Sequence, residues 1–253
     1  MSLTELNSRI RAKKTPLALT LSPEIHRLNP KILKNFTDMF GDVPMARAEA
    51  LRYHGTQLLD AAAERLPAVV LSGEHYLSCG MMGADVLCNL ITAAHAKGLY
   101  VILDVNTAQP ALWKEYGADA ITVCPYAGQD CLQAGEDCLP IAAVRTGNPS
   151  GGEAQSLLAG DRPLWLALSE QMARRGGALS VATGYSLDVR DVRRRCPDAF
   201  LLLPNCDGEN AVPAFDDFGH GALVTDDTLQ YAADAAGAMD DAVKALKKWV
   251  TVV

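Results

Sequence analysis

The chain has 253 residues, of which 49% are hydrophobic and 21% charged, and its formal net charge is −7. This length suits one large core, so we expect a single domain over residues 1–253. The acidic balance argues against nucleic acid or an anionic membrane as a partner, and no run of about 18 apolar residues offers a membrane span.

Apolar runs alternate with helical patterns along the chain. The predicted strands cover residues 16–22, 67–72, 99–104, 119–124, 140–146, 178–182, 199–204 and 221–225. The predicted helices cover residues 46–66, 83–97, 164–175, 188–195 and 240–250. Near-continuous apolar strands are typical of parallel sheets buried on both faces, and eight of them with helical crossovers predict an α/β fold, a closed (β/α)8 TIM barrel. An open doubly wound sheet is the alternative, although neither a GxGxxG after the first strand nor a P-loop supports it.

The third predicted strand has the most informative end. Its apolar run, residues 99–103, leads directly into Asp104, Asn106 and Gln109. Barrel enzymes present their sites in this way, with polar groups at the carboxyl ends of buried strands. Few residues separate Asp104 from the fourth strand, so a helix that begins at Pro110 has room for only about two turns.

The strand ends together predict a polar barrel mouth that is short of cations. Its polar and small residues are Ser22, Ser72, Asp104, Asn106, Cys124, Thr146, Gly147, Asn148, Thr183, Asn205, Asp207, Glu209, Asp226 and Asp227. Arg145 is the one basic residue beside it, and no histidine stands at a strand end. His54, His75 and His95 fall in helices or loops, where we expect structural roles.

The carboxylates of the mouth leave two interpretations open. Asp104, Glu209 and Asp226 or Asp227 are either solvated and helix-capping groups or oxygen ligands for Mg²⁺ or Ca²⁺. Residues 207–210 form a turn after the seventh strand, a place where barrels often bind phosphate. Their acidic surroundings disfavour a phosphate site, because like charges near a dianion repel it.

The N-terminus and the cysteines indicate the cellular compartment. The first 14 residues lack the apolar segment of a signal peptide. The seven cysteines are odd in number and contain no C-x-x-C pair, so neither a disulfide framework nor a zinc site is indicated, and a pairing of Cys131 with Cys138 across a loop stays open. We therefore expect a cytoplasmic protein with reduced thiols.

Several segments together resemble one known family. They are residues 21–23, 76–80, 101–104, 117–130, 145–149, 162–164 and 197–199, of which 117–130 is the most specific match. With these segments the chain resembles orotidine 5'-phosphate decarboxylase, in particular its longer bacterial subfamily. The resemblance implies a TIM barrel, a pyrimidine nucleotide as ligand and a homodimer formed through the barrel mouth.

The catalytic positions that the resemblance implies are altered. The family ends its third strand in Asp-x-Lys-x-x-Asp, where the Lys protonates the carbon left after loss of CO₂. The corresponding residues here are Asp104, Asn106 and Gln109, so the first Asp is retained and the other two positions are degenerate. Asn106 has no acidic proton to donate near neutral pH.

The ligand-binding positions that the resemblance implies are mostly substituted as well. They fall on Ser22, Val70, Thr146, Gly147, Glu209 and Thr228. The family has a second Lys where Val70 stands and a phosphate-binding Arg where Thr228 stands. Both cations are therefore missing.

These substitutions favour a non-catalytic or repurposed homologue of the decarboxylase, without a metal or cofactor. It would bind a pyrimidine nucleotide or another small molecule, and form a homodimer or pair with a related subunit. One alternative is a functioning decarboxylase whose proton comes from a bound water or another lysine, although Lys114, the nearest in sequence, is expected to face solvent. The other is a cation-dependent barrel enzyme with an acidic mouth.

Overall fold

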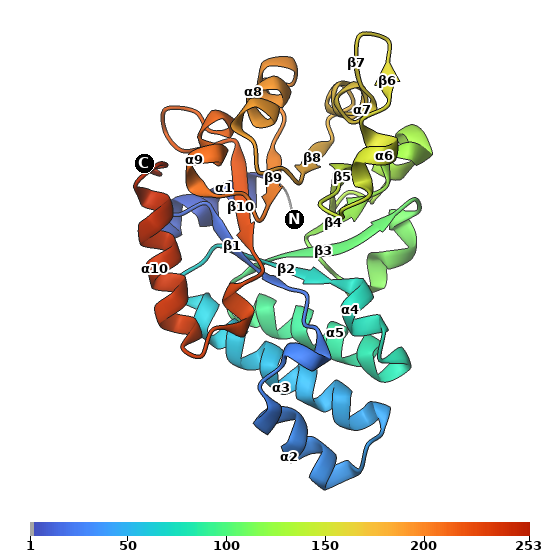
Figure 1. The fold of residues 1–253 in the computed structure, drawn as a ribbon, viewed down its shortest axis with the longest axis vertical. Helices are drawn as coiled ribbons and strands as arrows, with labels where there is room; N and C mark the ends of the chain where they lie inside the picture. The colour runs from blue at the N-terminus through green and yellow to red at the C-terminus, as the bar shows by residue number, and fades with distance from the viewer. Residues whose placement is uncertain (1–2) are drawn as a thin grey trace.

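The computed structural model describes residues 3–253, and its eight parallel strands close into a barrel with the neighbour order β1-β10-β9-β8-β5-β4-β3-β2 (Figure 1). The barrel strands are β1 (Leu17–Leu21), β2 (Ala68–Ser72), β3 (Tyr100–Thr107), β4 (Ala120–Val123), β5 (Leu139–Arg145), β8 (Ala178–Val181), β9 (Leu201–Pro204) and β10 (Ala222–Asp226). The predicted (β/α)8 barrel is confirmed, and its closure excludes the open doubly wound sheet. The single domain expected over residues 1–253 stays a prediction, and its first two residues lie outside the described residues.

Helices and short 3₁₀ segments connect the strands. The helices are α1 (Leu3–Lys13), α2 (Pro30–Phe40), α3 (Pro44–Ala63), α4 (Gly73–Leu77), α5 (Gly80–Ala96), α6 (Gly151–Gln155), α7 (Leu164–Ala173), α8 (Ser186–Arg195), α9 (Gly208–Ala211) and α10 (Ala235–Lys247). The 3₁₀ segments are η1 (Ile25–Arg27), η2 (Pro110–Tyr116), η3 (Pro125–Leu132), η4 (Val212–Ala214) and η5 (Leu229–Tyr231). A small antiparallel hairpin joins β6 (Leu158–Ala159) to β7 (Arg162–Pro163).

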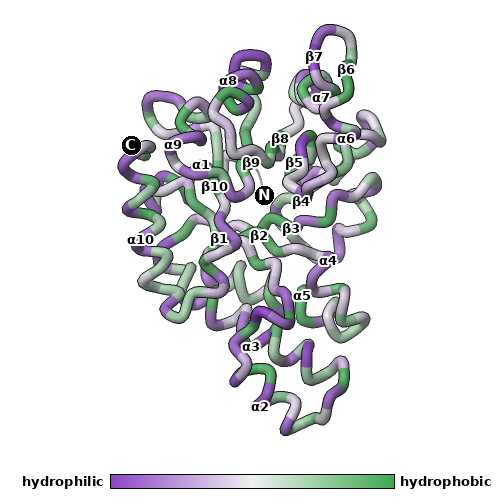
Figure 2. The backbone as a smooth tube through the Cα atoms, in the orientation of Figure 1, coloured by the Kyte–Doolittle hydropathy of each residue, from purple (hydrophilic) through white to green (hydrophobic). Residues whose placement is uncertain are grey.

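Side chains along the strands alternate between two apolar layers. Val70 and Ile102 point into the barrel, whereas Leu71 and Leu103 point outward against the surrounding helices. This alternation follows from the two-residue period of a strand. The hydropathy of the chain agrees, since the tube is green along buried strands such as β2 and purple over much of the outer surface (Figure 2).

The first helix seals the amino-terminal end of the barrel and was not predicted. Leu6 and Ile10 of α1 are buried against residues inside the barrel such as Ala18 and Tyr100. The sequence signal is weak because these two residues, four apart, form a narrow apolar stripe in a polar segment. Helix α2, also not predicted, contains no buried residue and lies with α3 at the lower end of Figure 1.

The third crossover is short, as predicted. Only the 3₁₀ segment η2 follows β3, and it ends at Gly117, whose φ of 71° favours glycine. Strand β3 itself runs to Thr107, three residues beyond the predicted end at Asp104, and its register with β4 shifts between Leu103 and Thr107. The strand end that carries the candidate site is therefore irregular.

Two smaller expectations concern the thiols and the membrane. All seven cysteines are free, so Cys131 and Cys138 do not pair. Within residues 3–253, no helix combines the length and apolar character required to cross a membrane.

Candidate functional site

A cavity of about 930 Å³ opens at the carboxyl ends of β2, β3, β5, β8 and β9. The strand ends contribute polar side chains to its wall, among them Ser72, Asp104, Arg145, Ser180 and Asn205. Barrels carry their sites at this face, because the loops that follow the strands converge there. The cavity is therefore the candidate functional site.

A hydrogen-bond network shapes the β3 side of the cavity. The buried Thr122 hydroxyl donates to Asp104 Oδ1 at 2.6 Å and accepts the backbone N–H groups of Val105 and Asn106, both at 2.9 Å. Asn106 has a φ of 43°, in the left-handed region, which Asn tolerates better than most residues. Thr122 thus holds the irregular end of β3 and leaves the Asn106 side chain exposed in the wall of the cavity.

Burial raises the pKa of the Asp104 carboxyl above its ordinary value. The hydrogen bond from Thr122 opposes this shift, Glu74 adds to it through charge repulsion, and His75 opposes it. Within residues 3–253, no Lys, Arg or His side chain forms an ion pair with Asp104. The carboxyl therefore stands in a site that favours its protonated form.

Arg145 is the one basic residue in the cavity wall, counted over the described residues, which confirms the predicted shortage of cations. Its Nη1 pairs with Asp188 Oδ2 and lies 3.3 Å from Thr183 Oγ1, and its guanidinium lies 5.1 Å from the centre of the Trp165 ring. The Thr183 hydroxyl donates to the same Asp188 oxygen at 2.7 Å. Asp188 thus neutralises the one positive charge that residues 3–253 present to the cavity.

Four of the predicted site residues meet in this cavity, namely Asp104, Asn106, Thr146 and Gly147. Gln109 lies beyond the end of β3, exposed, at the start of η2. Ser22 lies outside the lining, where its backbone N–H donates to the Gln230 side chain at 3.0 Å. Glu209 and Thr228 line a separate cavity of about 550 Å³ against α10, which shares Asn205 with the first.

The position predicted at Val70 requires a correction. Val70 pairs with Ile102 and is buried inside the barrel, outside the lining of the cavity. Two residues further along β2, Ser72 pairs with Asp104 and lines the cavity. Inward-facing residues recur every second position, so an offset of two residues keeps the face of the strand but changes the depth. The side chain next to Asp104 on β2 is therefore Ser72.

The mouth carboxylates do not converge. Asp104 lines the large cavity, whereas Glu209 and Asp226 line the smaller one. Asp226 accepts both the backbone N–H of Thr228, at 2.8 Å, and its hydroxyl, at 2.6 Å. Over residues 3–253, no three His, Cys, Asp or Glu side chains lie together in a way that could hold a metal ion. The geometry does not support the proposed cation site.

One polar pair at the cavity was not recognised from the sequence. Ser72 Oγ lies 2.8 Å from Nδ1 of His75, which belongs to α4, the short helix that directly follows β2. The sequence predicts only a structural role for His75, in a helix or loop. The three-residue spacing at the start of a helix, which brings side chains together, was the available signal.

The closed parallel barrel and the cavity at its carboxyl ends define a (β/α)8 barrel protein with a candidate site at the barrel mouth. No family model matches the chain. Orotidine 5'-phosphate decarboxylase from Bordetella petrii is 31% identical over 199 residues, 64% of this chain and 73% of the relative. The enzyme of the same name from Herpetosiphon aurantiacus is 28% identical over 222 residues, 81% of this chain and 78% of the relative.

Solved structures share the fold. The structure of Leishmania donovani OMP decarboxylase superposes with a TM-score of 0.80 at 24% identity, covering 98% of both chains. A structure of a putative orotidine-monophosphate-decarboxylase from Toxoplasma gondii gives 0.83 at 19% identity, covering 97% of this chain and 95% of that one. The chain belongs to the orotidine 5'-phosphate decarboxylase family, as the sequence resemblance implied.

Proposed function

We propose that this chain is a repurposed family member, which binds an uncharged, hydroxyl-bearing small molecule in the cavity and does not decarboxylate orotidine 5'-phosphate. The charge of the cavity wall carries the proposal. Its ionisable groups include Glu74, Asp104 and Arg145, no lysine lines it among residues 3–253, and Asp188 neutralises Arg145. An anionic substrate meets no unpaired cation there.

The missing proton donor is the chemical reason to expect no decarboxylation. A positioned general acid contributes roughly 10²–10⁴-fold to a rate. Asn106 stands where the family pattern has its Lys and cannot serve as that acid. Lys114 is exposed on η2 and lines a different cavity. One alternative retains decarboxylation with Asp104 as the acid, since burial raises its pKa.

The wall of the cavity favours a neutral polar ligand. Its uncharged hydrogen-bonding side chains include Ser72, Asn106, Thr146, Asn148, Gln155, Ser180, Thr183 and Asn205. Hydroxyl and amide groups both donate and accept, so they suit sugar hydroxyls and ring amides. The residues at the implied phosphate positions, Glu209 and Thr228, lie in the other cavity beside Asp226, where a carboxylate repels a phosphate. A pyrimidine nucleoside therefore fits the site better than its phosphate ester.

Release of CO₂ from orotidine 5'-phosphate tests the absence of decarboxylation, with the Bordetella petrii relative as a positive control. We expect no turnover above background from this chain. Turnover on the order of 1 s⁻¹ or faster, a normal enzymatic rate, would overturn the proposal.

Thermal unfolding with uridine or uridine monophosphate tests the ligand chemistry. A ligand at a hundredfold excess over its Kd stabilises the folded state by about 2.7 kcal/mol. We expect uridine to raise the Tm at least as much as the monophosphate does, and Ser180→Leu, which fills the cavity wall, to abolish the shift. A shift with the monophosphate alone contradicts the proposed ligand class.

The rim of the mouth supports a homodimer or pairing with a related subunit. Met81, Tyr126, Leu158 and Tyr185 follow different strands at this face, and the first is 91% exposed. Exposed apolar side chains at a protein's surface can serve as protein contacts. We expect a dimer in sedimentation equilibrium, and a monomer after Met81→Asp combined with Tyr185→Asp. A parent chain that stays monomeric at about 100 µM contradicts the homodimer and leaves pairing with a related subunit.

A further inference from the structure

The contact between Ser72 and His75 goes beyond the ligand binding proposed above, in which Ser72 is only one polar group of the cavity wall. Ser72 precedes α4 as its N-cap residue, yet its hydroxyl makes no capping bond to the helix backbone. The hydroxyl lies instead 2.8 Å from His75 Nδ1. A serine hydroxyl held against an imidazole nitrogen is the arrangement in which a base activates a nucleophile.

The surroundings place Ser72 in the cavity wall. Ser72 is 7% exposed, lines the cavity and pairs with Asp104 across β2 and β3. A Cβ on Gly73 would lie 2.4 Å from a Val105 side-chain carbon, so glycine allows the start of α4 to approach β3 closely. His75, the partner of the hydroxyl, is half-buried on α4.

We propose that Ser72 and His75 form a nucleophile–base pair that hydrolyses small carboxylic esters in the cavity. This inference rests on the proposed function only in that the cavity is no longer used for decarboxylation. The neutral hydroxyl and amide groups of the wall suit an ester whose alcohol part is polar and uncharged.

The step conserves atoms and charge. Ser72 Oγ attacks the ester carbonyl carbon while its proton passes to His75 Nδ1, and collapse of the tetrahedral intermediate expels the alcohol, which takes the proton from His75. Water then attacks the acyl group on Ser72, with His75 as base, and releases the acid and the free serine. Asp104, the direct neighbour of Ser72 on β3, stabilises the oxyanion by a hydrogen bond when its carboxyl is protonated.

Covalent labelling tests the nucleophile directly. The full chain is treated with a fluorophosphonate and analysed by intact mass and peptide mapping, and hydrolysis of p-nitrophenyl acetate is followed in parallel. We expect one adduct on Ser72, and at least a hundredfold loss of hydrolysis in Ser72→Ala and in His75→Gln. No adduct, an adduct elsewhere, or full hydrolysis by Ser72→Ala overturns the proposal.

Ser78→Ala is the matched control. Ser78 lies on the same segment, three residues after His75, but its hydroxyl donates to the His75 carbonyl oxygen at 2.6 Å and does not line the cavity. We expect it to be labelled and to hydrolyse the ester like the parent chain, and circular dichroism verifies the fold of every variant. An adduct on Ser72 together with turnover of orotidine 5'-phosphate would overturn the proposed function alone. Absence of both would overturn only the esterase.

Discussion

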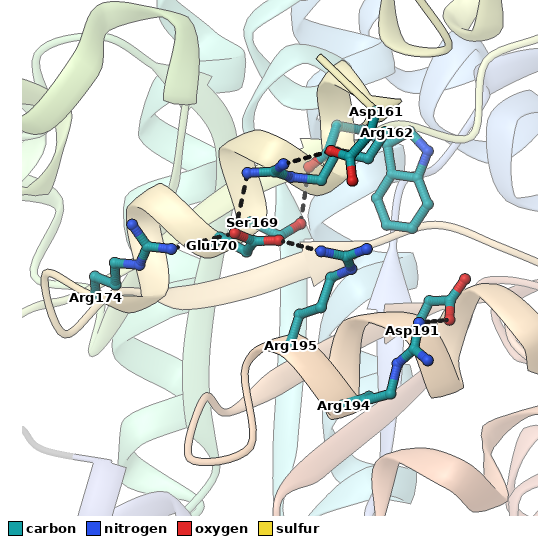
Figure 3. Close-up of polar contacts among 9 residues, drawn as sticks. Asp161, Arg162, Ser169, Glu170, Arg174, Asp191, Arg194 and Arg195 are labelled. Carbon is teal, nitrogen blue, oxygen red and sulfur yellow. Dashed lines mark hydrogen bonds and ion pairs between the residues drawn. The ribbon is translucent and has the colours of Figure 1, made fainter. Parts of the chain in front are cut away.

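Two regions of the molecule use charge in opposite ways. On α7, the buried carboxylate of Glu170 accepts from Arg162 and Arg174, each at 3.2 Å, and from Arg195 at 2.9 Å (Figure 3). In the cavity wall cations are scarce instead: Arg145 is the one Lys or Arg side chain that the described residues contribute, and Asp104 accepts from the Thr122 hydroxyl and not from a cation.

This difference in charge pairing distinguishes the structural network around Glu170 from the candidate site in the cavity. The guanidinium groups around Glu170 come from β7, from Arg174 directly after α7, and from α8, so the network ties the β6–β7 hairpin and two helices together. The cavity instead leaves hydroxyls and amides exposed to a ligand. Charges that satisfy one another hold the fold, whereas neutral polar groups in a cavity wall can both donate to and accept from a ligand.

The largest effect is expected at the structural network. Glu170→Ala leaves three neighbouring guanidinium groups without their shared acceptor, and we expect the free energy of unfolding to fall by about 2–3 kcal/mol. Urea denaturation measures it. Arg174→Ala is the control, because this Arg side chain is 77% exposed and such pairs contribute no more than about 1 kcal/mol. Equal effects of the two variants would contradict a role for Glu170 as the shared acceptor.

The next effect is expected at the end of β3. Thr122→Val keeps the volume but leaves the N–H groups of Val105 and Asn106 without their acceptor and Asp104 without its donor. We expect a loss of about 1–3 kcal/mol in the free energy of unfolding. Thr122→Ser retains the hydroxyl and serves as the control. Unchanged stability in the Val variant would show that water replaces the hydroxyl at no cost.

A smaller effect is expected in ligand selectivity. Asp188→Asn removes the negative charge that neutralises Arg145, so uridine monophosphate should gain about tenfold in affinity relative to uridine, roughly 1.4 kcal/mol. Isothermal titration calorimetry measures both ligands. Asp191→Asn, on the same helix but paired with Arg194 at 3.1 Å outside the cavity, should leave the ratio unchanged. If both variants gained affinity for uridine monophosphate relative to uridine, the cause would be the change in net charge and not the release of Arg145.

The smallest effect concerns the pH dependence of stability. Burial raises the pKa of Asp104 in the folded state, so its stabilising contribution is full below the unfolded value of about 3.9 and is lost as pH rises through the folded pKa. Asp104→Asn should therefore remove a decline in stability above about pH 4. Asp161→Asn should show the opposite sign, because the hydrogen bond from Arg162 lowers the pKa of Asp161. Parallel pH profiles for the parent chain and Asp104→Asn would contradict the raised pKa.

Much of the barrel could be predicted from local patterns. Each of the eight predicted apolar runs forms a barrel strand. A strand that is buried on both faces is apolar along its whole length, so it can be recognised without knowing which strands pair with it. The short crossover after β3 followed from chain length alone. Helix α1 was not predicted because its apolar pattern consists of only two residues, Leu6 and Ile10. Their burial depends on contact with the barrel interior, which the sequence does not show.

The candidate site, like the barrel, was only partly predictable from the sequence. The sequence alone determined the identity of Asp104, Asn106, Thr146 and Gly147 as mouth residues, because they end or follow strands. Only the tertiary structure decided that Ser72 stands beside Asp104 in place of Val70, that Asp188 neutralises Arg145, and that Glu209 and Thr228 line another cavity. The physical reason is that composition and periodicity specify which face a side chain takes, whereas its depth and its partners depend on register between strands and on loops that meet only in the closed barrel.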